Sequence, residues 1–395
     1  MKSFKQSPRD FRFVQSPYGF YRRALQQGDL FHWENYDRIC AVSWRAVNFF
    51  LRDRRWGRED QSGQSQQYGS HLEPFMRLER NSMLELDQPR HTRLRNLVSR
   101  AFTSRSIAAL RPDIECIAAN ILDELGAGTI ELQRGFGERL PVLVITRLLG
   151  IAEDMADQLL AWSHDMVTMY QARRNHATEL QAATAASDFS DFMNDEFNRR
   201  LRRPGDDLIS RLLVVETEGQ RLTRDEMIST CILLLNAGHE ATAYTIGNGI
   251  KTIVESRLPP CQVFAAENVA GAVEEILRFD PPLHMFERHC KEDMEAFGHR
   301  FRRGDLVAVL LAAANRDPAH VSDPESFDPM RKPVANASFG AGIHFCVGAP
   351  LARMELAVAL PAVFRRHPKL AFAEPPRYAD RYHFHGLERL LVTTD

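Results

Sequence analysis

The 395-residue chain has no apolar run long enough to cross a membrane and almost no net charge. A membrane-spanning helix needs ~18 or more consecutive apolar residues. The first residues, MKSFKQSPRDFRF, contain no apolar segment of the kind that signal peptides carry. The formal net charge of −2 argues against a nucleic-acid binder. We therefore expect a cytoplasmic protein with neither a membrane nor a nucleic acid as its partner.

The six cysteines are widely scattered, and none belongs to a C-x-x-C pair or to another spacing typical of zinc sites. In a reducing compartment an isolated cysteine is usually a small buried side chain. We expect this of five of them, namely Cys40, Cys116, Cys231, Cys261 and Cys290. Cys346 differs from these, because three glycines surround it in the sequence.

No stretch has the composition of a linker or of an internal repeat, so the sequence predicts a single domain over residues 1–395. Alternating apolar side chains predict a hairpin over 30–43, and 58–82 is expected to be a loop or a short helix. Helices are predicted at 90–102, 104–125, 139–150, 153–172, 177–201, 205–217, 223–256 and 350–366, and strands at 284–289, 294–303 and 306–311. The predicted fold class is mainly α with a minor β portion.

The helix predicted over 223–256 has clear limits. Thr223 to Glu226 reads T-R-D-E, a capping box in which each side chain accepts a hydrogen bond from the other residue's backbone N–H. Pro259 and Pro260 mark its far limit. A helix of that length usually crosses a whole domain. Gly238 inside it costs ~1 kcal/mol relative to alanine, which indicates a local reason for glycine.

The most specific stretch of the chain is SFGAGIHFCVGAPLARME, residues 338–355. Its glycines permit tight turns and the close approach of a large flat ligand. A helical run begins just after Cys346, so backbone N–H groups favour the thiolate, which is the form that ligates metal. The alternative is a glycine-rich turn around a buried cysteine.

Within this stretch, FGAGIHFCVGAPLAR resembles the cysteine-ligand loop of the cytochrome P-450 superfamily. The family pattern F-G-x-G-x-H-x-C-x-G-x-x-L-A-R is met at every fixed position. The resemblance implies the cytochrome P-450 fold, with haem b between a long distal helix and a proximal loop that carries the iron ligand Cys346. It also implies that Phe339, His344 and Gly348 contact the haem. A thiolate ligand favours O–O cleavage over simple O2 carriage.

An E-x-x-R motif at Glu275 and Arg278 agrees with this resemblance. Taken alone, such a pair is most often a surface ion pair on one helix face. In the family the two residues form a structural ion cluster with a third member, which matches Arg331 here. A buried bidentate pair of this kind fixes geometry more than it adds stability. We expect the cluster to hold the proximal side in shape for haem.

Four cationic or imidazole side chains match family residues that bind the haem propionates. His91 and Arg95 lie four apart on one predicted helix face, so both point in the same direction. Arg288 follows the E-x-x-R helix, and His344 lies two residues before the ligand cysteine. Taken singly, each would more often be a solvated charge. Together they form a plausible clamp for the two carboxylates of haem.

The long helix matches the family's A-G-x-[D/E]-T-T motif with A-G-H-E-A-T, residues 237–242. The resemblance implies catalytic roles for Glu240, Ala241 and Thr242, with Gly238 making room for O2 and Glu240 linking the site to water. Ala241 stands where the family usually supplies a hydroxyl. Thr242 lies about 100° further round the helix, so it cannot substitute. We expect a water or a polar group of the substrate to complete proton delivery.

The resemblance further implies a monooxygenase that inserts one oxygen atom of O2 into a small or medium organic substrate. Its electrons would come from NAD(P)H through a separate ferredoxin and ferredoxin reductase. An acidic ferredoxin would suit a basic patch, for which the candidates are Arg100, Arg105, Arg111 and Arg353. Substrate contact is expected, by family position, at Phe75, Met76, Asn236, His284, Met285 and His385.

Two other functions stay open at this point. A peroxide-dependent peroxygenase would use hydrogen peroxide in place of O2 and electrons. Such enzymes tend to carry an arginine in the distal helix, and none occurs over residues 236–245. A haem sensor or carrier without turnover is the other alternative, and the retained Glu240 together with the complete ligand loop argues against it.

Overall fold

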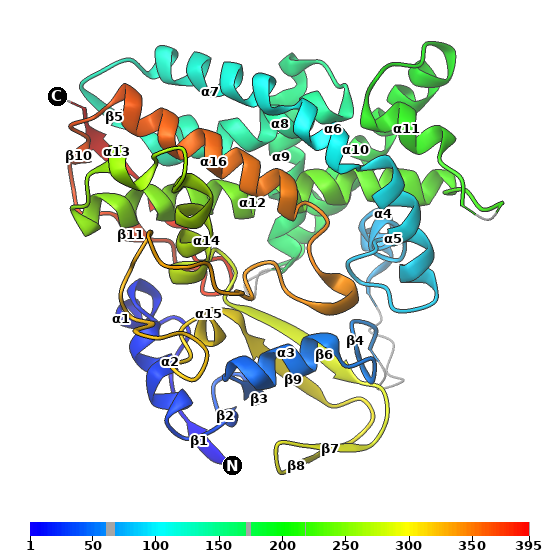
Figure 1. Ribbon diagram of the computed structural model, residues 1–395. Helices are drawn as coiled ribbons and strands as arrows, with labels where there is room; N and C mark the ends of the chain where they lie inside the picture. Colours follow the sequence, from blue (N-terminus) through cyan, green and yellow to red (C-terminus); the bar gives the residue numbers. More distant parts are fainter. Residues whose placement is uncertain (61–67, 171–174, 218, 395) are drawn as a thin grey trace. The chain divides into compact units, whose positions relative to one another are not determined.

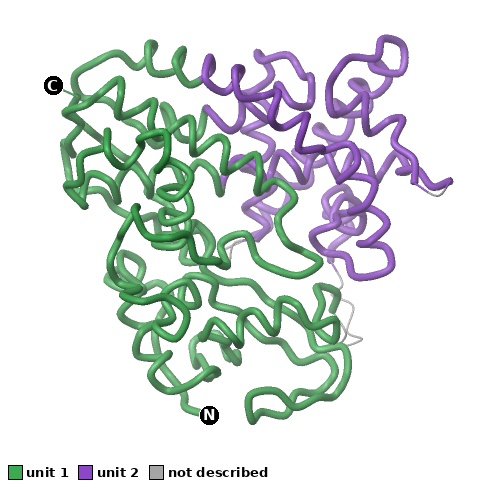
Figure 2. Tube along the Cα trace, in the orientation of Figure 1, with its two compact units in different colours: residues 1–64, 118–139, 241–395 green, residues 65–117, 140–240 purple. Residues whose placement is uncertain are grey.

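The computed structural model describes residues 1–60, 68–170, 175–217 and 219–394. Contacts between Cα atoms group the chain into two compact units, which Figure 2 shows in different colours. Unit 1 comprises 1–64, 118–139 and 241–395, and unit 2 comprises 65–117 and 140–240. Each unit combines segments that are separated in the sequence. The single domain over 1–395 stays a prediction.

Unit 1 contains a six-stranded sheet with the order β1-β2-β3-β9-β6-β4 (Figure 1). Its strands are β1 (Lys2–Phe4), β2 (Leu30–Trp33), β3 (Arg38–Ala41), β4 (Trp56–Gly57), β6 (Met285–Cys290) and β9 (Leu306–Leu310). The predicted hairpin over 30–43 is confirmed, because β2 and β3 pair antiparallel. β9 pairs parallel with β3, so the sheet joins the N-terminal part of the chain to residues far away in sequence.

The remaining elements of unit 1 are short strands and helices. The strands are β5 (Thr129–Glu131), β7 (Met294–Ala296), β8 (His299–Phe301), β10 (Ala371–Phe372), β11 (Arg377–Tyr378), β12 (Leu387–Arg389) and β13 (Leu391–Thr393). The helices are α1 (Phe11–Gln15), α2 (Tyr18–Leu25), α3 (Trp44–Arg52), the π-helix η2 (Gln133–Glu138), α13 (Pro260–Val263), α14 (Val269–Phe279), α15 (Leu311–Ala314), the 3-10 helix η5 (Gly342–His344) and α16 (Ala349–Arg366).

Unit 2 is helical almost throughout its described residues. Its helices are η1 (Ser70–Leu72), α4 (Glu73–Glu79), α5 (Arg90–Ala101), α6 (Ser104–Ala109), α8 (Arg139–Leu149), η3 (Glu153–Met155), α9 (Ala156–Val167), η4 (Thr168–Tyr170), α10 (His176–Arg202) and α11 (Leu208–Val214). Two helices run from one unit into the other, α7 (Arg111–Leu125) and α12 (Arg224–Ser256). The predicted class, mainly α with a minor β portion, is confirmed.

Most predicted helices are found within two or three residues of their expected limits, and two differ for local reasons. The helix expected over 104–125 is divided into α6 and α7, and Pro112 falls in the first turn of α7, where its missing N–H costs nothing. In the region expected to be helical over 153–172, 3-10 turns flank α9, and residues 171–172 lie outside the described residues.

Helix α12 begins with the predicted capping box. The Thr223 N–H donates to Glu226 Oε2 at 2.9 Å, and the Glu226 N–H donates to Thr223 Oγ1 at 3.3 Å. The helix is 33 residues long and ends before Pro259. No helix within the described ranges is long and apolar enough to span a membrane.

Two of the five cysteines expected to be buried, Cys116 and Cys261, are exposed. The expectation was therefore wrong for these two and correct for Cys40, Cys231 and Cys290. The stripe of buried residues on α7 runs through Ile114, Ile117 and Ile121, and Cys116 lies beside this stripe. The helical period of the isoleucines was a signal that could have placed Cys116 correctly.

Candidate functional site

Cys346 lies between two helices of unit 1, η5 and α16, and its side chain is half-buried. Its backbone N–H donates to the Phe339 carbonyl at 3.0 Å, which closes the loop around it. Its own carbonyl accepts from the N–H of Ala349, the first residue of α16, at 3.4 Å. The sulfur is thus held beside a helix N-terminus, where the peptide dipoles favour a thiolate.

The loop requires glycine at two positions. Gly340 and Gly342 have φ values of +67° and +72°, in the left-handed region that side chains with a Cβ rarely adopt. A Cβ at Gly342 would also overlap the carbonyl oxygen of Leu51. A Cβ at Gly348 would lie 3.8 Å from Cys346 Sγ, so glycine there leaves the space beside the sulfur open. The loop therefore fits a flat ligand that approaches a cysteine.

Phe339 is half-buried, and the guanidinium of Arg353 lies 4.5 Å from the centre of its ring. Arg353 also forms an ion pair with Glu274 on α14. The ligand loop and α16 are thereby bound to α14 through one charged side chain. Because the charge of Arg353 is already paired, this residue is a weaker candidate for binding an acidic ferredoxin than its sequence position suggests.

Of the four residues predicted to bind the haem propionates, two lie in each unit. Arg288, on β6, and His344, in η5, belong to unit 1, and Arg288 is only 3% exposed. His91 and Arg95 belong to α5 in unit 2, where His91 is 1% exposed and Arg95 is half-buried. A buried guanidinium requires anionic or carbonyl partners, and Arg288 Nη1 donates to the Glu287 carbonyl at 2.8 Å. This donor chemistry fits carboxylates, and the clamp stays a prediction.

The centre of α12 has one accessible face although most of its residues are buried. Leu233, Ala237 and Ala241 recur every four residues and are partly or fully accessible, while Glu240 and Thr242 are 7% and 6% exposed. Positions four apart lie on one face of a helix. The face contains small side chains at its centre and leaves room beside the helix, as a bulky ligand requires.

Thr245 bonds to the backbone of this same segment, which the sequence analysis did not foresee. Its Oγ1 donates to the Ala241 carbonyl at 2.7 Å, and the residue is 2% exposed. Threonine in a helix commonly bonds the carbonyl four residues earlier, so its spacing from Ala241 was an available signal. The hydroxyl of Thr245 is therefore engaged with the helix backbone.

Gly238 has a packing role that differs from the expected one. A Cβ at this position would lie 2.8 Å from Cδ1 of Ile145, on α8 of unit 2. Glycine thus allows α12 to approach α8 closely, whereas the sequence interpretation assigned it the role of making room for O2. The predicted role of Gly238 in making room for O2 stays a prediction.

His239 is buried, with only 1% of its surface exposed. Its Nδ1 donates to the Leu235 carbonyl at 2.9 Å, and its ring centre lies 5.7 Å from that of His164 on α9. Burial lowers the pKa of His239 to about 4, a shift that the Leu235 bond opposes and the neighbouring His164 reinforces. The imidazole is neutral at pH 7.

The E-x-x-R residues form a buried ion network and not a surface pair. Arg278 donates to both oxygens of Glu275 at 2.7 Å, and the two residues are 1% and 4% exposed. Arg278 also donates to three backbone carbonyls, those of Asn315, Pro324 and Ser326. Arg331 Nε lies 3.5 Å from Glu275 Oε1. The network joins α14 to the irregular segment that precedes the ligand loop.

Three of the candidate substrate residues lie in unit 2. Phe75, on α4, is buried, and its ring centre lies 6.2 Å from that of Tyr170. Met76, beside it, is half-buried. Asn236 lies at the edge of the accessible face of α12, with its Nδ2 3.8 Å from Met166 Sδ and its Oδ1 buried without a hydrogen-bond partner among the described residues.

His284 and His385, in unit 1, contact each other, with ring centres 4.4 Å apart. His284 Nδ1 lies 2.8 Å from the Tyr21 hydroxyl, and His385 Nε2 lies 3.3 Å from Asp280 Oδ1. Both histidines are at most 3% exposed. Burial lowers the pKa of His284 well below its usual value, and the neighbouring His385 lowers it further. This placement favours a structural role for the two histidines over substrate contact.

Asp280 is the centre of this buried cluster, and the sequence analysis missed it. Its Oδ1 accepts from the Tyr18 hydroxyl at 2.5 Å, and its Oδ2 accepts from the Tyr378 hydroxyl. Burial raises the pKa of this carboxyl, but His385, Lys251 and the hydrogen bond from Tyr18 outweigh the effect and hold the pKa well below its usual value. Met285, another candidate substrate residue, packs into the neighbouring apolar cluster with Phe13, Phe20 and Tyr21. Its side chain is therefore part of the hydrophobic core.

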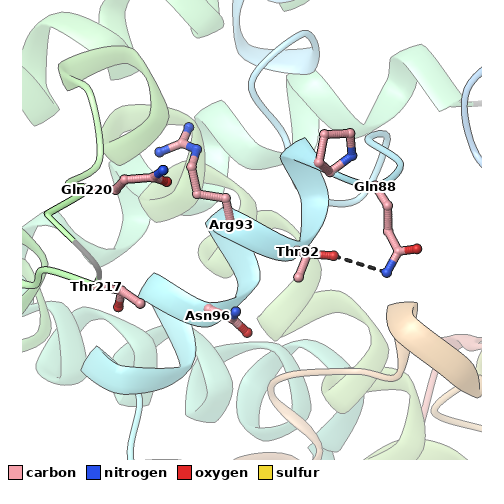
Figure 3. A pocket seen from close by; sticks show the side chains of 7 residues that line it. Gln88, Thr92, Arg93, Asn96, Thr217 and Gln220 are labelled. Atoms are coloured by element: carbon pink, nitrogen blue, oxygen red, sulfur yellow. Dashed lines mark hydrogen bonds between the residues drawn. The ribbon is translucent and has the colours of Figure 1, made fainter.

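A pocket of about 360 Å³ lies beside α5, and it contains none of the predicted site residues. Figure 3 shows polar side chains around it, with Gln88 donating to Thr92 at 3.2 Å. Arg93, which lines the pocket, forms an ion pair with Glu226. Because the charge of Arg93 is already paired, the described residues that line the pocket offer no unpaired cation to an anionic ligand.

Comparison with known proteins identifies the class. The profile of the family described as Cytochrome P450 matches residues 269–370. The chain is 35% identical over 353 residues to the polyketide biosynthesis cytochrome P450 PksS of Bacillus subtilis, which covers 87% of this chain and 86% of that protein. It is 39% identical over 291 residues to 6-deoxyerythronolide B hydroxylase of Saccharopolyspora erythraea, covering 72% and 70%.

A solved structure agrees with these relatives. The crystal structure of P450BioI in complex with hexadec-9Z-enoic acid ligated acyl carrier protein superimposes with a TM-score of 0.90 at 30% identity, over 97% of this chain and all of that one. The chain therefore belongs to the cytochrome P450 family, and it is a haem b-dependent monooxygenase.

Proposed function

We propose that this monooxygenase oxidises a small or medium organic molecule that carries a polar group, with electrons supplied by a separate ferredoxin-type donor. Bound haem supplies the activation of O2, and a thiolate ligand promotes that chemistry. Cys346 is the ligand that fits, because its loop leaves space at Gly348 and holds the sulfur at a helix N-terminus. Arg288, His344, His91 and Arg95 are the residues that would hold the propionates.

The observation that carries the proposal is the absence of a hydroxyl from the accessible face of α12. The accessible positions at its centre are Leu233, Asn236, Ala237, Gly238 and Ala241, and none has a hydroxyl group. Thr245 donates to the Ala241 carbonyl. Protons must therefore reach the reacting oxygen through ordered water or through a polar group of the substrate, with Glu240 as the acid that links the site to solvent.

Asn236 supports a polar substrate. Its amide lies at the edge of the accessible face, and its Oδ1 has no hydrogen-bond partner among the described residues. Its Nδ2 faces only the weak acceptor Met166 Sδ. A buried amide left in this state costs free energy, which a hydroxyl or carbonyl group of a substrate would recover. The names of the relatives, which include polyketide biosynthesis and a carrier-bound fatty acid, favour oxygenated or carboxylated chains as first candidates.

Replacement of Ala241 by threonine tests the proton route. The assay measures product formed per NADPH consumed, with a reconstituted ferredoxin system and two substrates that differ only in one hydroxyl. The wild-type enzyme should form more product per NADPH with the hydroxylated substrate than with its deoxy analogue. Ala241→Thr should reduce this difference. Equal coupling for the two substrates in both proteins would contradict the substrate-assisted route.

The same assay separates the alternative functions. Turnover with hydrogen peroxide alone, at the rate of the complete ferredoxin system, would favour a peroxygenase. Absence of any reductant consumption stimulated by members of a broad metabolite library would favour a sensor or carrier. Loss of rate with increasing salt would support an electrostatic encounter with an acidic ferredoxin. A cytoplasmic location stays a prediction from the sequence.

A further inference from the structure

His71, His176 and Glu179 form a compact group in unit 2, apart from all the residues assigned above. His71 lies in η1, and the other two lie in the first turn of α10. His71 Nε2 is 2.9 Å from Glu179 Oε2, and His176 Nδ1 is 4.0 Å from the same oxygen. The two imidazole rings are 4.7 Å apart, and one ligand atom from each residue lies within 4.8 Å of the others.

The local structure fixes the backbone from which two of these three side chains project. Asn175 caps α10 and exchanges hydrogen bonds with Thr178, so the first turn of the helix is well defined. His176 and Glu179 are three residues apart and therefore project from the same side of the helix. Their side chains are 70% and 21% exposed, and that of His71 is 27% exposed. An ion can reach the group from solvent.

Two imidazoles and one carboxylate are a donor set that suits first-row divalent metals, and Zn²⁺ in particular. Metal–ligand distances of ~2.0–2.2 Å place neighbouring ligand atoms ~3–3.5 Å apart in a tetrahedral site. The pair of His71 and Glu179 is already near this separation, and the exposed His176 needs only a rotation of its side chain. We propose that these three residues form a zinc-binding site, with water as the fourth ligand.

Bound zinc would join η1 to the first turn of α10. α4 follows η1 directly, and its Phe75 contacts Tyr170, which lies a few residues before α10. The metal would thus fix two segments that both border candidate substrate residues. A cross-link between distant parts of a chain restricts their separation, so zinc should suppress local opening of this part of unit 2.

Other histidine–carboxylate contacts of the chain are less suited to an ion. His32 and Asp37 form a pair with a 3.0 Å contact on the surface, but no third ligand joins the pair among the residues that the structure describes. In the buried cluster, both oxygens of Asp280 already accept from tyrosine hydroxyls. The pair of His32 and Asp37 is therefore a matched control, since it has the same contact without the complete donor set.

Calorimetric titration of the tag-free, haem-loaded protein with ZnCl2 tests the site. We expect one ion per chain, with the affinity reduced at least about tenfold by each of His71→Asn, His176→Asn and Glu179→Gln, and unchanged by His32→Asn. Zinc should slow amide exchange at residues 70–79 and 176–183 in the wild type but not in Glu179→Gln.

Absence of saturable binding would overturn the proposal. So would binding that survives all three substitutions, as it would if zinc were held by the exposed Cys116 or Cys261. Normal haem content and an unchanged melting temperature in metal-free buffer would show that the substituted proteins are folded.

Discussion

At the centre of α12, the side chains of two buried polar residues form hydrogen bonds to backbone carbonyls of the same helix. Thr245 donates to the carbonyl of Ala241, and His239 donates to that of Leu235. In each case the acceptor lies four residues earlier, as is typical of side chains that bond back to their own helix. At the centre of the accessible face lie Ala237 and Ala241, which have no polar side-chain atoms, and the amide of Asn236 lies at its edge. In the function that we propose, proton delivery depends on Glu240, on water and on the substrate.

His239 should make the stability of the protein sensitive to acid. Its pKa is about 4 in the folded protein and near 6.5 in an unfolded chain, so the unfolded state binds more protons between these values. The free energy of unfolding should fall as the pH drops through this window, by roughly 2 kcal/mol from this residue between pH 7 and pH 5. Denaturant titrations of the wild type and His239→Gln at both pH values measure it. Identical pH dependence in the two proteins would contradict the shift.

At the scale of elements, buried polar side chains join segments that are far apart in the sequence. Arg278 of α14 bonds to three carbonyls of the segment that leads to the ligand loop. Gln133 of the π-helix η2 donates to the Ala243 carbonyl of α12 at 3.3 Å. Each of these side chains thus links a helix to backbone that is distant in the sequence.

Arg278→Lys should destabilise the protein by about 1.5–3 kcal/mol, because a lysine keeps the charge but cannot replace the bidentate pair with Glu275 or all three bonds to backbone carbonyls. Arg139→Lys is the surface control. Arg139 pairs with Glu124 at 2.8 Å, and its side chain is 40% exposed, so little change is expected. Thermal unfolding of the haem-loaded proteins measures both. An equal loss of stability in the two variants would show that burial of the network does not increase its contribution to stability.

Gly247 of α12 and Gln133 of η2 should be energetically coupled. A Cβ at Gly247 would overlap Gln133 Oε1, so Gly247→Ala should cost about 1–3 kcal/mol in spite of the higher helix propensity of alanine. Gln133→Ala should remove most of this cost in the double variant. Gly271→Ala on α14 is the control, since its nearest neighbour would be 3.7 Å away. Additive losses in the double-mutant cycle would contradict the contact.

For the whole molecule, the sequence predicted the helices well and the tertiary contacts poorly. Helix α12 was predicted to within one residue because its capping box and the prolines beyond it are local signals. The Cys346 loop was identified from a continuous motif. The contact between His284 and His385 could not be predicted, because it depends on the return of the C-terminal segment to residues that follow α14. The proximity of Gly238 to Ile145 could not be predicted either, because Ile145 lies on another helix.

The central claim is that Cys346 provides a thiolate to haem in a monooxygenase of the cytochrome P450 family. The carbon monoxide difference spectrum of the reduced protein tests this most directly. We predict the red-shifted Soret band of a thiolate-ligated haem in the wild type and in the exposed-cysteine control Cys261→Ser. Cys346→Ser should lose that band while retaining bound haem. Retention of the band in Cys346→Ser, or its absence from the haem-loaded wild type, would contradict the account.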